Sequence, residues 1–233
     1  MNLLNEPINV ITEKLIKNEK STSVVYMNPH SYCLNYNNKK YQESISSNSF
    51  LLIDGVLLQL SLFLKFKKKI HRNIGETSMY YFLKNLPYKN ILILGPSKEK
   101  GEIFVKFLKK KNIKFDYKIN EITYFYNKVD KETLKKIIKK INISKFNLII
   151  NTIGAPKQEI LSYQIIKEIK FKLIILNVGA VIDYTTDKKF LYLKYFRIIR
   201  LEWFYRFCIS PLKIGKRIFI SSPLFLYLFF LSK

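Results

Sequence analysis

The chain has 233 residues, which is enough for one large core or for one domain of ordinary size with an appendage. Its 41 basic and 17 acidic residues give a formal net charge of +24, which suits nucleic acid, an anionic bilayer or a phosphorylated substrate without choosing among them. The two Cys and two His residues show no metal-ligand spacing, and no stretch reaches the roughly 18 apolar residues needed to cross a bilayer, which argues against a metal centre and a membrane span. Cys33 and Cys208 are far apart in sequence, so we expect a reducing cytoplasm. The N-terminus carries Glu6 and Pro7 and does not read as a signal peptide.

Six short apolar runs rich in β-branched residues predict the strands of a sheet. They lie at residues 23–27, 50–53, 90–94, 115–119, 148–152 and 173–178. Segments with helical spacing separate these runs, and such alternation indicates a mainly parallel sheet with helices on both faces. The sequence therefore predicts a Rossmann-like α/β fold, with ligands at the carboxyl ends of its strands.

Polar residues stand at several of these strand ends. Asn28 follows the first predicted strand, Asp54-Gly55 the second, and Asp183 closes the turn after the sixth. A carboxylate at the mouth of the sheet, beside the flexible backbone of Gly55, is where a general base is expected, so Asp54 is the candidate catalytic residue. The alternative is that Asp54 is the N-cap of a helix that starts at Val56.

Two lysine runs lie at residues 65–69 and 109–111, where helices are expected to end. Positive charge near the C-terminus of a helix complements the helix dipole. We therefore interpret both runs as solvated helix ends.

The segment after the fifth predicted strand reads IGAPKQE and suggests an anion site. Gly154 lets the backbone approach a ligand, and Pro156 suits the first position of a helix. The amides of that first helical turn are expected to point outward and favour a phosphate, with Lys157 and Gln158 adding a charge and two amide donors. The alternative is a plain helix cap in which Glu159 complements the dipole.

From about residue 190 the chain is rich in aromatic and basic residues, has little Gly and no longer alternates strands with turns. We therefore expect an α/β domain at 1–194 and a helical, basic and aromatic appendage at 195–233. Only five of the 41 basic residues are Arg, and four of them follow residue 196. Because the planar guanidinium grips phosphate well, these late Arg residues, together with Lys157, are the groups available to hold a diphosphate. Glu202 can instead pair with Arg206 across one helical turn.

The end of the appendage has the makeup of a membrane-surface helix. Lys213, Lys216 and Arg217 fall on one helical face, close to Trp203 and to the apolar stretch 218–231. Such a face suits an anionic bilayer, so we expect these three cations to contact the membrane. The apolar stretch could equally belong to the core.

Four sequence blocks, in this order, resemble the TagA/WecG/CpsF glycosyltransferases, glycosyltransferase family 26, over most of the chain. They are Asp54-Gly55, Arg72-Asn73-Ile74-Gly75-Glu76, Gly154-Ala155-Pro156-Lys157-Gln158-Glu159 and Leu201-Glu202-Trp203-Phe204-Tyr205-Arg206. The early Thr-Pro-Asn turn of the family reads Tyr26-Met27-Asn28 here. Four blocks in order are a more specific signal than any one of them.

The resemblance implies an inverting, metal-independent transferase that needs no cofactor. It would move a sugar of the N-acetylmannosamine type, or a related hexose, from a UDP-sugar to a polyprenyl-diphosphate-linked sugar in cell-surface polysaccharide synthesis. Asp54 would match the catalytic base, while Asn28, Arg72, Asp183 and the turn from Gly154 to Glu159 would contact substrates. At least one of Arg200 and Arg206 would reach the UDP.

We therefore expect a peripheral enzyme on the cytoplasmic face of the cell membrane, with a homo-oligomer as one option. The alternative is a basic, non-catalytic module that binds nucleic acid. Its aromatic residues are not interleaved with basic ones in a stacking pattern, and it gives no reason for Asp54-Gly55 or for the turn at 154–159. We accordingly expect no nucleic-acid partner.

Overall fold

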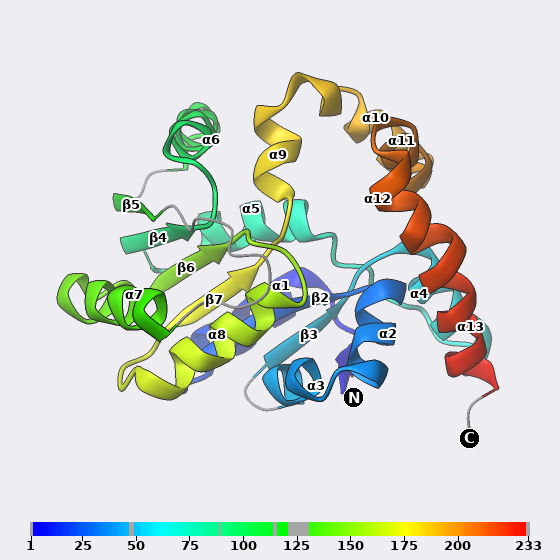
Figure 1. Cartoon of the computed structure of the whole chain (residues 1–233), viewed down its shortest axis with the longest axis horizontal. Helices are drawn as coiled ribbons and strands as arrows, with labels where there is room; N and C mark the ends of the chain where they lie inside the picture. Colours follow the sequence, from blue (N-terminus) through cyan, green and yellow to red (C-terminus); the bar gives the residue numbers. More distant parts are fainter. Residues whose placement is uncertain (1, 47–48, 89, 114–115, 121–130, 232–233) are drawn as a thin grey trace.

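The computed structural model describes residues 2–46, 49–88, 90–113, 116–120 and 131–231. Within them, seven strands form one sheet in the order β1-β3-β2-β7-β6-β4-β5 (Figure 1). Every pairing between neighbouring strands is parallel. The prediction of an α/β fold with a parallel sheet is therefore confirmed.

All six predicted strands are present, with ends displaced by no more than a residue. The strands are β1 (Leu3–Leu4), β2 (Thr22–Met27), β3 (Ser49–Ile53), β4 (Asn90–Leu94), β5 (Asp116–Asn120), β6 (Leu148–Asn151) and β7 (Ile174–Asn177). Phe115, where one predicted strand begins, lies outside the described residues. The pattern missed β1 because two residues are too few to show a period.

Helices connect the strands and cover both faces of the sheet. They are α1 (Ile8–Lys17), α2 (Pro29–Asn37), α3 (Lys39–Ser46), α4 (Val56–Phe66), α5 (Gly75–Asn85), α6 (Lys98–Lys110), α7 (Lys131–Ser144), α8 (Lys157–Glu168) and α9 (Val181–Thr186). A C-terminal series follows, made of a 3-10 turn η1 (Lys188–Phe190), α10 (Leu193–Ile198), α11 (Glu202–Ile209), α12 (Pro211–Lys216), a π-helical turn η2 (Arg217–Ser221) and α13 (Ser222–Phe230).

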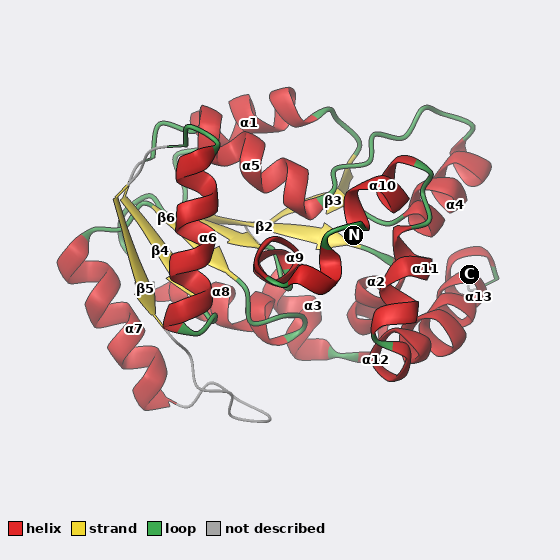
Figure 2. Ribbon diagram, turned by 90° about the horizontal axis from the view of Figure 1, so that it is seen from above, coloured by secondary structure: helices red, strands yellow, loops and turns green. Residues whose placement is uncertain are grey.

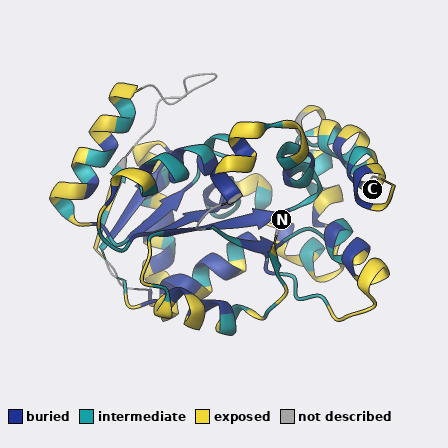
Figure 3. Ribbon diagram, turned by 90° about the horizontal axis from the view of Figure 1, so that it is seen from below, coloured by how far each residue is buried: buried dark blue, intermediate teal, exposed yellow. Residues whose placement is uncertain are grey.

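Strand residues alternate between the two faces. Val24 and Tyr26 of β2 pack in a cluster with α1, α5 and α6, whereas Val25 and Met27 pack in a second cluster with α2, α3 and α4. A third cluster joins α7 and α8 to β4, β6 and β7. Helices α1 and α5 lie on one side of the sheet and α3 and α7 on the other (Figure 2), and the central strands β2, β6 and β7 are buried along their length (Figure 3). Burial on both faces explains why these strands read as continuous apolar runs.

The neighbouring strands β2 and β7 lead to helices on opposite faces. Cys33 of α2 packs in the second cluster, whereas Val181 and Ile182 of α9 pack in the first. The loops that follow β2 and β7 therefore diverge at the carboxyl edge of the sheet and leave a crevice between them. Such a switch in direction is where open α/β sheets bind their ligands.

The C-terminal series arches from α9 across this carboxyl edge and descends beside α2 and α4 (Figure 1). Phe225, Leu228 and Phe229 of α13 are buried in the second cluster, against Tyr32 of α2 and Leu58 of α4. The end of the predicted appendage thus supplies core, while Phe219 and Leu231 remain largely exposed. None of the described helices is long and apolar enough to cross a membrane.

Candidate functional site

Two adjoining pockets open at the carboxyl edge of the sheet, under the C-terminal series. The first, the polar cleft, has a volume of about 260 Å³ and lies among the loops after β2, β3, β6 and β7. The second, the apolar pocket, has a volume of about 430 Å³ and lies between α4 and the segment from α11 to η2. The residues that line both are Asn28, His30, Asp54, Glu202, Arg206, Ile214 and Arg217.

Asp54 stands where the two pockets meet. It follows β3 and its Oδ1 accepts a hydrogen bond of 2.7 Å from the N–H of Gly55, which has a φ of +85°. The Nε of Arg72 lies 3.6 Å from the same oxygen. Gly55, not Asp54, is the N-cap of α4, and no side chain caps that helix, so the N-cap alternative is wrong. The carboxylate is therefore held beside both pockets, with one of its oxygens engaged.

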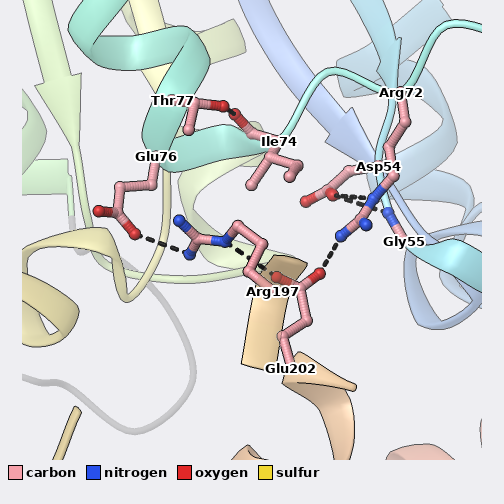
Figure 4. A network of polar contacts seen from close by, with 8 residues as sticks. All are labelled: Asp54, Gly55, Arg72, Ile74, Glu76, Thr77, Arg197 and Glu202. Atoms are coloured by element: carbon pink, nitrogen blue, oxygen red, sulfur yellow. Dashed lines mark hydrogen bonds and ion pairs between the residues drawn. The ribbon is translucent and has the colours of Figure 1, made fainter. Parts of the chain in front are cut away.

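A chain of ion pairs fastens the C-terminal series over Asp54 (Figure 4). Arg72 donates to one oxygen of Glu202, and the Nε of Arg197 donates to the other at 3.1 Å. The Nη2 of Arg197 also donates to Glu76 at 2.8 Å. Since all four side chains are largely buried, this network holds α10 and α11 against α5 and the loop before it.

The network shows which partners Glu202 and Arg72 have in the folded chain. Glu202 pairs with Arg72 and Arg197, so the proposed helical pair with Arg206 is not the contact that forms. Arg72, expected to bind substrate, has its guanidinium engaged by Asp54 and Glu202, and burial lowers its pKa. Sequence reasoning missed Arg197 as a site residue, although its place among the few Arg residues was a usable signal.

Arg206 and Arg217 bring positive charge to the junction of the pockets. Neither forms an ion pair with a carboxylate of the described residues. Arg206 stacks on the ring of Tyr184 at 4.5 Å, and burial lowers its pKa to about 10, so it stays protonated at neutral pH. Burial also lowers the pKa of Arg217. His30 is neutral here, because burial and, secondarily, Arg217 lower its pKa to about 4.

The C-terminal cations do not all lie where the sequence predicted them. Arg217, expected at the membrane, lines both pockets, whereas Arg200, expected at the diphosphate, is exposed and lines neither. Lys216 is exposed, and the side chain of Lys213 lies outside what the structure describes. Of the two Arg residues expected to reach the UDP, the geometry favours Arg206.

The turn after β6 is built differently from the predicted anion site. Gln158 is buried, and its Oε1 accepts from the N–H groups of Gly154 and Gly179 at 3.2 and 3.0 Å. Its Nε2 donates to Glu159 and to the backbone of Asn177. The amide of Gln158 itself donates to the carbonyl of Gly154. The amides of Gly154 and Gln158 are therefore engaged within the protein, and the Gln158 side chain joins the loops after β6 and β7.

Replacing Gln158 by Ala is expected to cost stability, because it leaves the partly buried backbone N–H groups of Gly154 and Gly179 without their acceptor. We expect the free energy of unfolding to fall by about 1–3 kcal/mol. Urea unfolding measures this, with Gln164→Ala on the outer part of the same helix as the control. Equal stability of the two variants would show that the Gln158 side chain does not join the loops.

Glu159 is buried at the floor of the polar cleft, and one of its oxygens has no partner in the described structure. Burial raises the pKa of its carboxyl to about 7 from an ordinary 4.5. The folded protein therefore keeps a proton that the unfolded chain loses, so stability is expected to fall as pH rises from 4.5 to 7 and to stay level above.

Glu159→Gln is expected to remove this component of the pH dependence. The component amounts to about 3 kcal/mol, from about 1.4 kcal/mol per pH unit. Urea unfolding of the parent and the variant at pH 5 and pH 8 measures it, with the exposed Glu168→Gln as the control. If the parent and Glu159→Gln lose the same stability between these pH values, Glu159 is not the group that titrates.

The remaining predicted residues surround the polar cleft. Asn28 caps α2 by accepting from the N–H of Ser31 at 3.1 Å and lines both pockets. Asp183 lines the cleft and pairs with Lys100 at 2.7 Å. Gly154 lines it too, with open space where a Cβ would stand, whereas Lys157 begins α8 outside both pocket walls. Among the described residues, no group of three or more His, Cys, Asp or Glu is arranged to hold a metal ion.

Comparison with known proteins agrees with this arrangement. The model of the "Glycosyl transferase WecG/TagA/CpsF family" matches residues 3–233. A relative from Staphylococcus aureus (strain MRSA252), the N-acetylglucosaminyldiphosphoundecaprenol N-acetyl-beta-D-mannosaminyltransferase, is 26% identical over 219 residues, which cover 90% of this chain and 81% of that protein. A parallel α/β sheet, a carboxylate at its carboxyl edge and a family match along almost the whole chain lead to one conclusion: the chain is a glycosyltransferase of the WecG/TagA/CpsF family.

Proposed function

We propose that this glycosyltransferase moves a sugar, N-acetylmannosamine or a related hexose, from a UDP-sugar to a polyprenyl-diphosphate-linked sugar, in the synthesis of a cell-surface polysaccharide. The observation that carries the proposal is the place of Asp54 at the junction of a polar and an apolar pocket. A transferase of this kind needs one site for a charged, water-soluble donor and one for an amphiphilic acceptor. Its general base must reach both.

The polar cleft suits the donor. Its walls include the loops after β6 and β7, which diverge from the loop after β2 at the ligand-binding edge of the sheet. Arg206 and Arg217 lie at its junction with the apolar pocket and have no carboxylate partner in the described structure, so they are available for the two phosphates of UDP. Lys189, which is more than half exposed and lies 3.8 Å from Asp187, adds a further cation to its wall.

The apolar pocket suits the lipid-linked acceptor. Leu57 and Leu60 of α4 line one side, and Trp203 and Ile218 of the C-terminal series line the other. Such walls favour the first units of a prenyl chain, whose burial is worth about 0.8 kcal/mol per CH₂ group. The acceptor sugar would then be turned toward Asp54 at the junction of the two pockets.

The chemistry follows from these positions. The acceptor hydroxyl gives its proton to Asp54 while its oxygen forms a bond to the anomeric carbon of the donor sugar. The bond from that carbon to the UDP oxygen breaks, and its electron pair leaves on the diphosphate. Arg206 stabilises the charge that develops there, and attack from the face opposite the leaving group inverts the anomeric configuration.

Tyr26 bears on which sugar is transferred. Tyr26 is among the residues that line the polar cleft, and its ring lies 3.6 Å from the position of a Cβ on Gly75, in a place where the family motif has the smaller Thr. A Thr would leave more room beside Gly75, which also lines the cleft. A specificity test has to include donors with and without an N-acetyl group.

The test is a panel of UDP-sugars, each assayed for UDP release with a short prenyl-diphosphate-linked sugar as the acceptor. We expect acceptor-dependent release from one donor or a few, and a broader set with Tyr26→Thr. Release that does not depend on the acceptor, or no release from any UDP-sugar, would contradict the proposal. The relative from Staphylococcus aureus makes UDP-N-acetylmannosamine the first donor to try.

Two further parts of the proposal concern place and partners. The lipid-linked acceptor puts the enzyme on the inner face of the cell membrane, where the C-terminal cations and exposed apolar residues would meet anionic lipid. Membership of a glycosyltransferase family replaces the alternative of a non-catalytic nucleic-acid-binding module.

A further inference from the structure

Helix α4 carries apolar residues on two sides. Leu58 and Leu62 face inward and are buried in the second core cluster. Leu60, Phe63 and Leu64 recur at helical spacing on the other side and are 50%, 47% and 47% exposed. A helix that is apolar all round normally lies within a core or a membrane. The outer side of α4 therefore suits contact with an apolar environment outside the core.

The outer side of α4 adjoins the exposed apolar residues of the C-terminal series. Lys65 donates to the backbone of Phe229 at 3.1 Å and lies 4.8 Å from the centre of its ring, which joins α4 to α13. The two helices lie side by side in Figures 1 and 2. Leu60 and Trp203 also face each other across the apolar pocket. The two apolar surfaces thus meet at the mouth of that pocket.

Three lysines follow α4 directly in the chain. Lys67, Lys68 and Lys69 are all exposed and none forms an ion pair with a described carboxylate. The helix dipole explains one or two cations at the end of a helix. It does not explain why three lysines follow a helix whose outer side is apolar and exposed. Apolar side chains bordered by lysines match the interface of an anionic bilayer.

We propose that the outer side of α4, with Lys67, Lys68 and Lys69, docks on an anionic lipid bilayer. The membrane surface of the enzyme then has two halves, α4 from the α/β domain and the C-terminal series, and the apolar pocket opens between them. A lipid-linked acceptor can then enter from the bilayer without crossing water. This last step rests on the proposed function, whereas docking itself does not.

Vesicle binding tests the proposal on the full-length protein. Phe63→Ser/Leu64→Ser changes two exposed residues that line neither pocket, and a second variant changes all three lysines to Gln. Ile103→Ser/Ile143→Ser, on α6 and α7 away from α4, is the matched control, because both residues are exposed. Cosedimentation uses vesicles of phosphatidylglycerol and phosphatidylcholine at low and high salt.

We expect both α4 variants to bind vesicles about tenfold more weakly or worse, and the control to bind normally. Thermal unfolding should be unchanged in all three, and UDP release with a water-soluble acceptor should stay within twofold of the parent. Unchanged vesicle binding would overturn the proposal. So would equal loss in the control, or normal vesicle binding with altered self-association by light scattering, which would make this side of α4 an interface between copies.

The two proposals fail separately. Vesicle binding is read without any sugar donor, so it remains informative if no UDP-sugar is transferred. Conversely, transfer to a water-soluble acceptor is read without a bilayer, so it survives if α4 does not dock.

Discussion

Asp54→Asn is expected to lower turnover by about 10²–10⁴-fold, the usual contribution of a general base. Asn keeps the size of the side chain and its acceptor oxygen for the Gly55 N–H, but it cannot take a proton from the acceptor hydroxyl. UDP binding should stay within a few-fold of the parent, because a base acts in the transition state more than on the leaving group of the bound donor. Steady-state kinetics and UDP titration by calorimetry measure the two quantities.

The control for Asp54→Asn is Asp183→Asn, which also removes a carboxylate from the wall of the polar cleft. Asp183 pairs with Lys100 on α6 and lines only the polar cleft, away from the junction of the pockets. We therefore expect its loss to affect donor binding, and so KM, more than kcat. Near-normal turnover of Asp54→Asn would remove Asp54 from the mechanism. An equal fall in kcat for both variants would mean that negative charge in the cleft, rather than a base, is what matters.

Arg206→Gln is expected to lower turnover by about 10²-fold or more, since one preorganised donor to a developing oxyanion contributes that much. The loss should appear even with a water-soluble acceptor in the absence of vesicles, because Arg206 lies at the junction of the two pockets and not on the outer face. Kinetics with such an acceptor separate a role in catalysis from a role in membrane binding.

Arg200→Gln is the matched control for Arg206→Gln. Both variants lose one positive charge from the same segment, but Arg200 is exposed and lines neither pocket. We expect its kinetics with a water-soluble acceptor to be near normal. If Arg200→Gln has the larger effect, the C-terminal series must rearrange on binding substrate, and the assignment of Arg206 to the diphosphate is wrong.

The elements of the fold were predictable because their signals are local. A strand buried on both faces must be apolar along its length, so runs such as 148–152 and 173–178 were visible without any knowledge of their neighbours. The position of Asp54 was predictable for the same reason, because the end of a buried strand in a parallel sheet lies at its carboxyl edge. The four family blocks likewise identified the enzyme class from contiguous residues.

The contacts of the charged and polar side chains were decided by tertiary structure. Glu202 had a plausible partner one helical turn away in Arg206, yet it pairs with Arg72, which is 130 positions earlier in the chain. Gln158 looked like a ligand-facing donor, but it hydrogen-bonds across to Gly179 in the next loop. Arg217 looked like a membrane contact, and only the fold shows that it lines both pockets. A buried charge or amide must find partners when water is removed, and those partners come from whichever segments packing brings together. The sequence by itself therefore determined the strands, the enzyme family and the place of the candidate base, whereas the fold alone decided which cations line the two pockets.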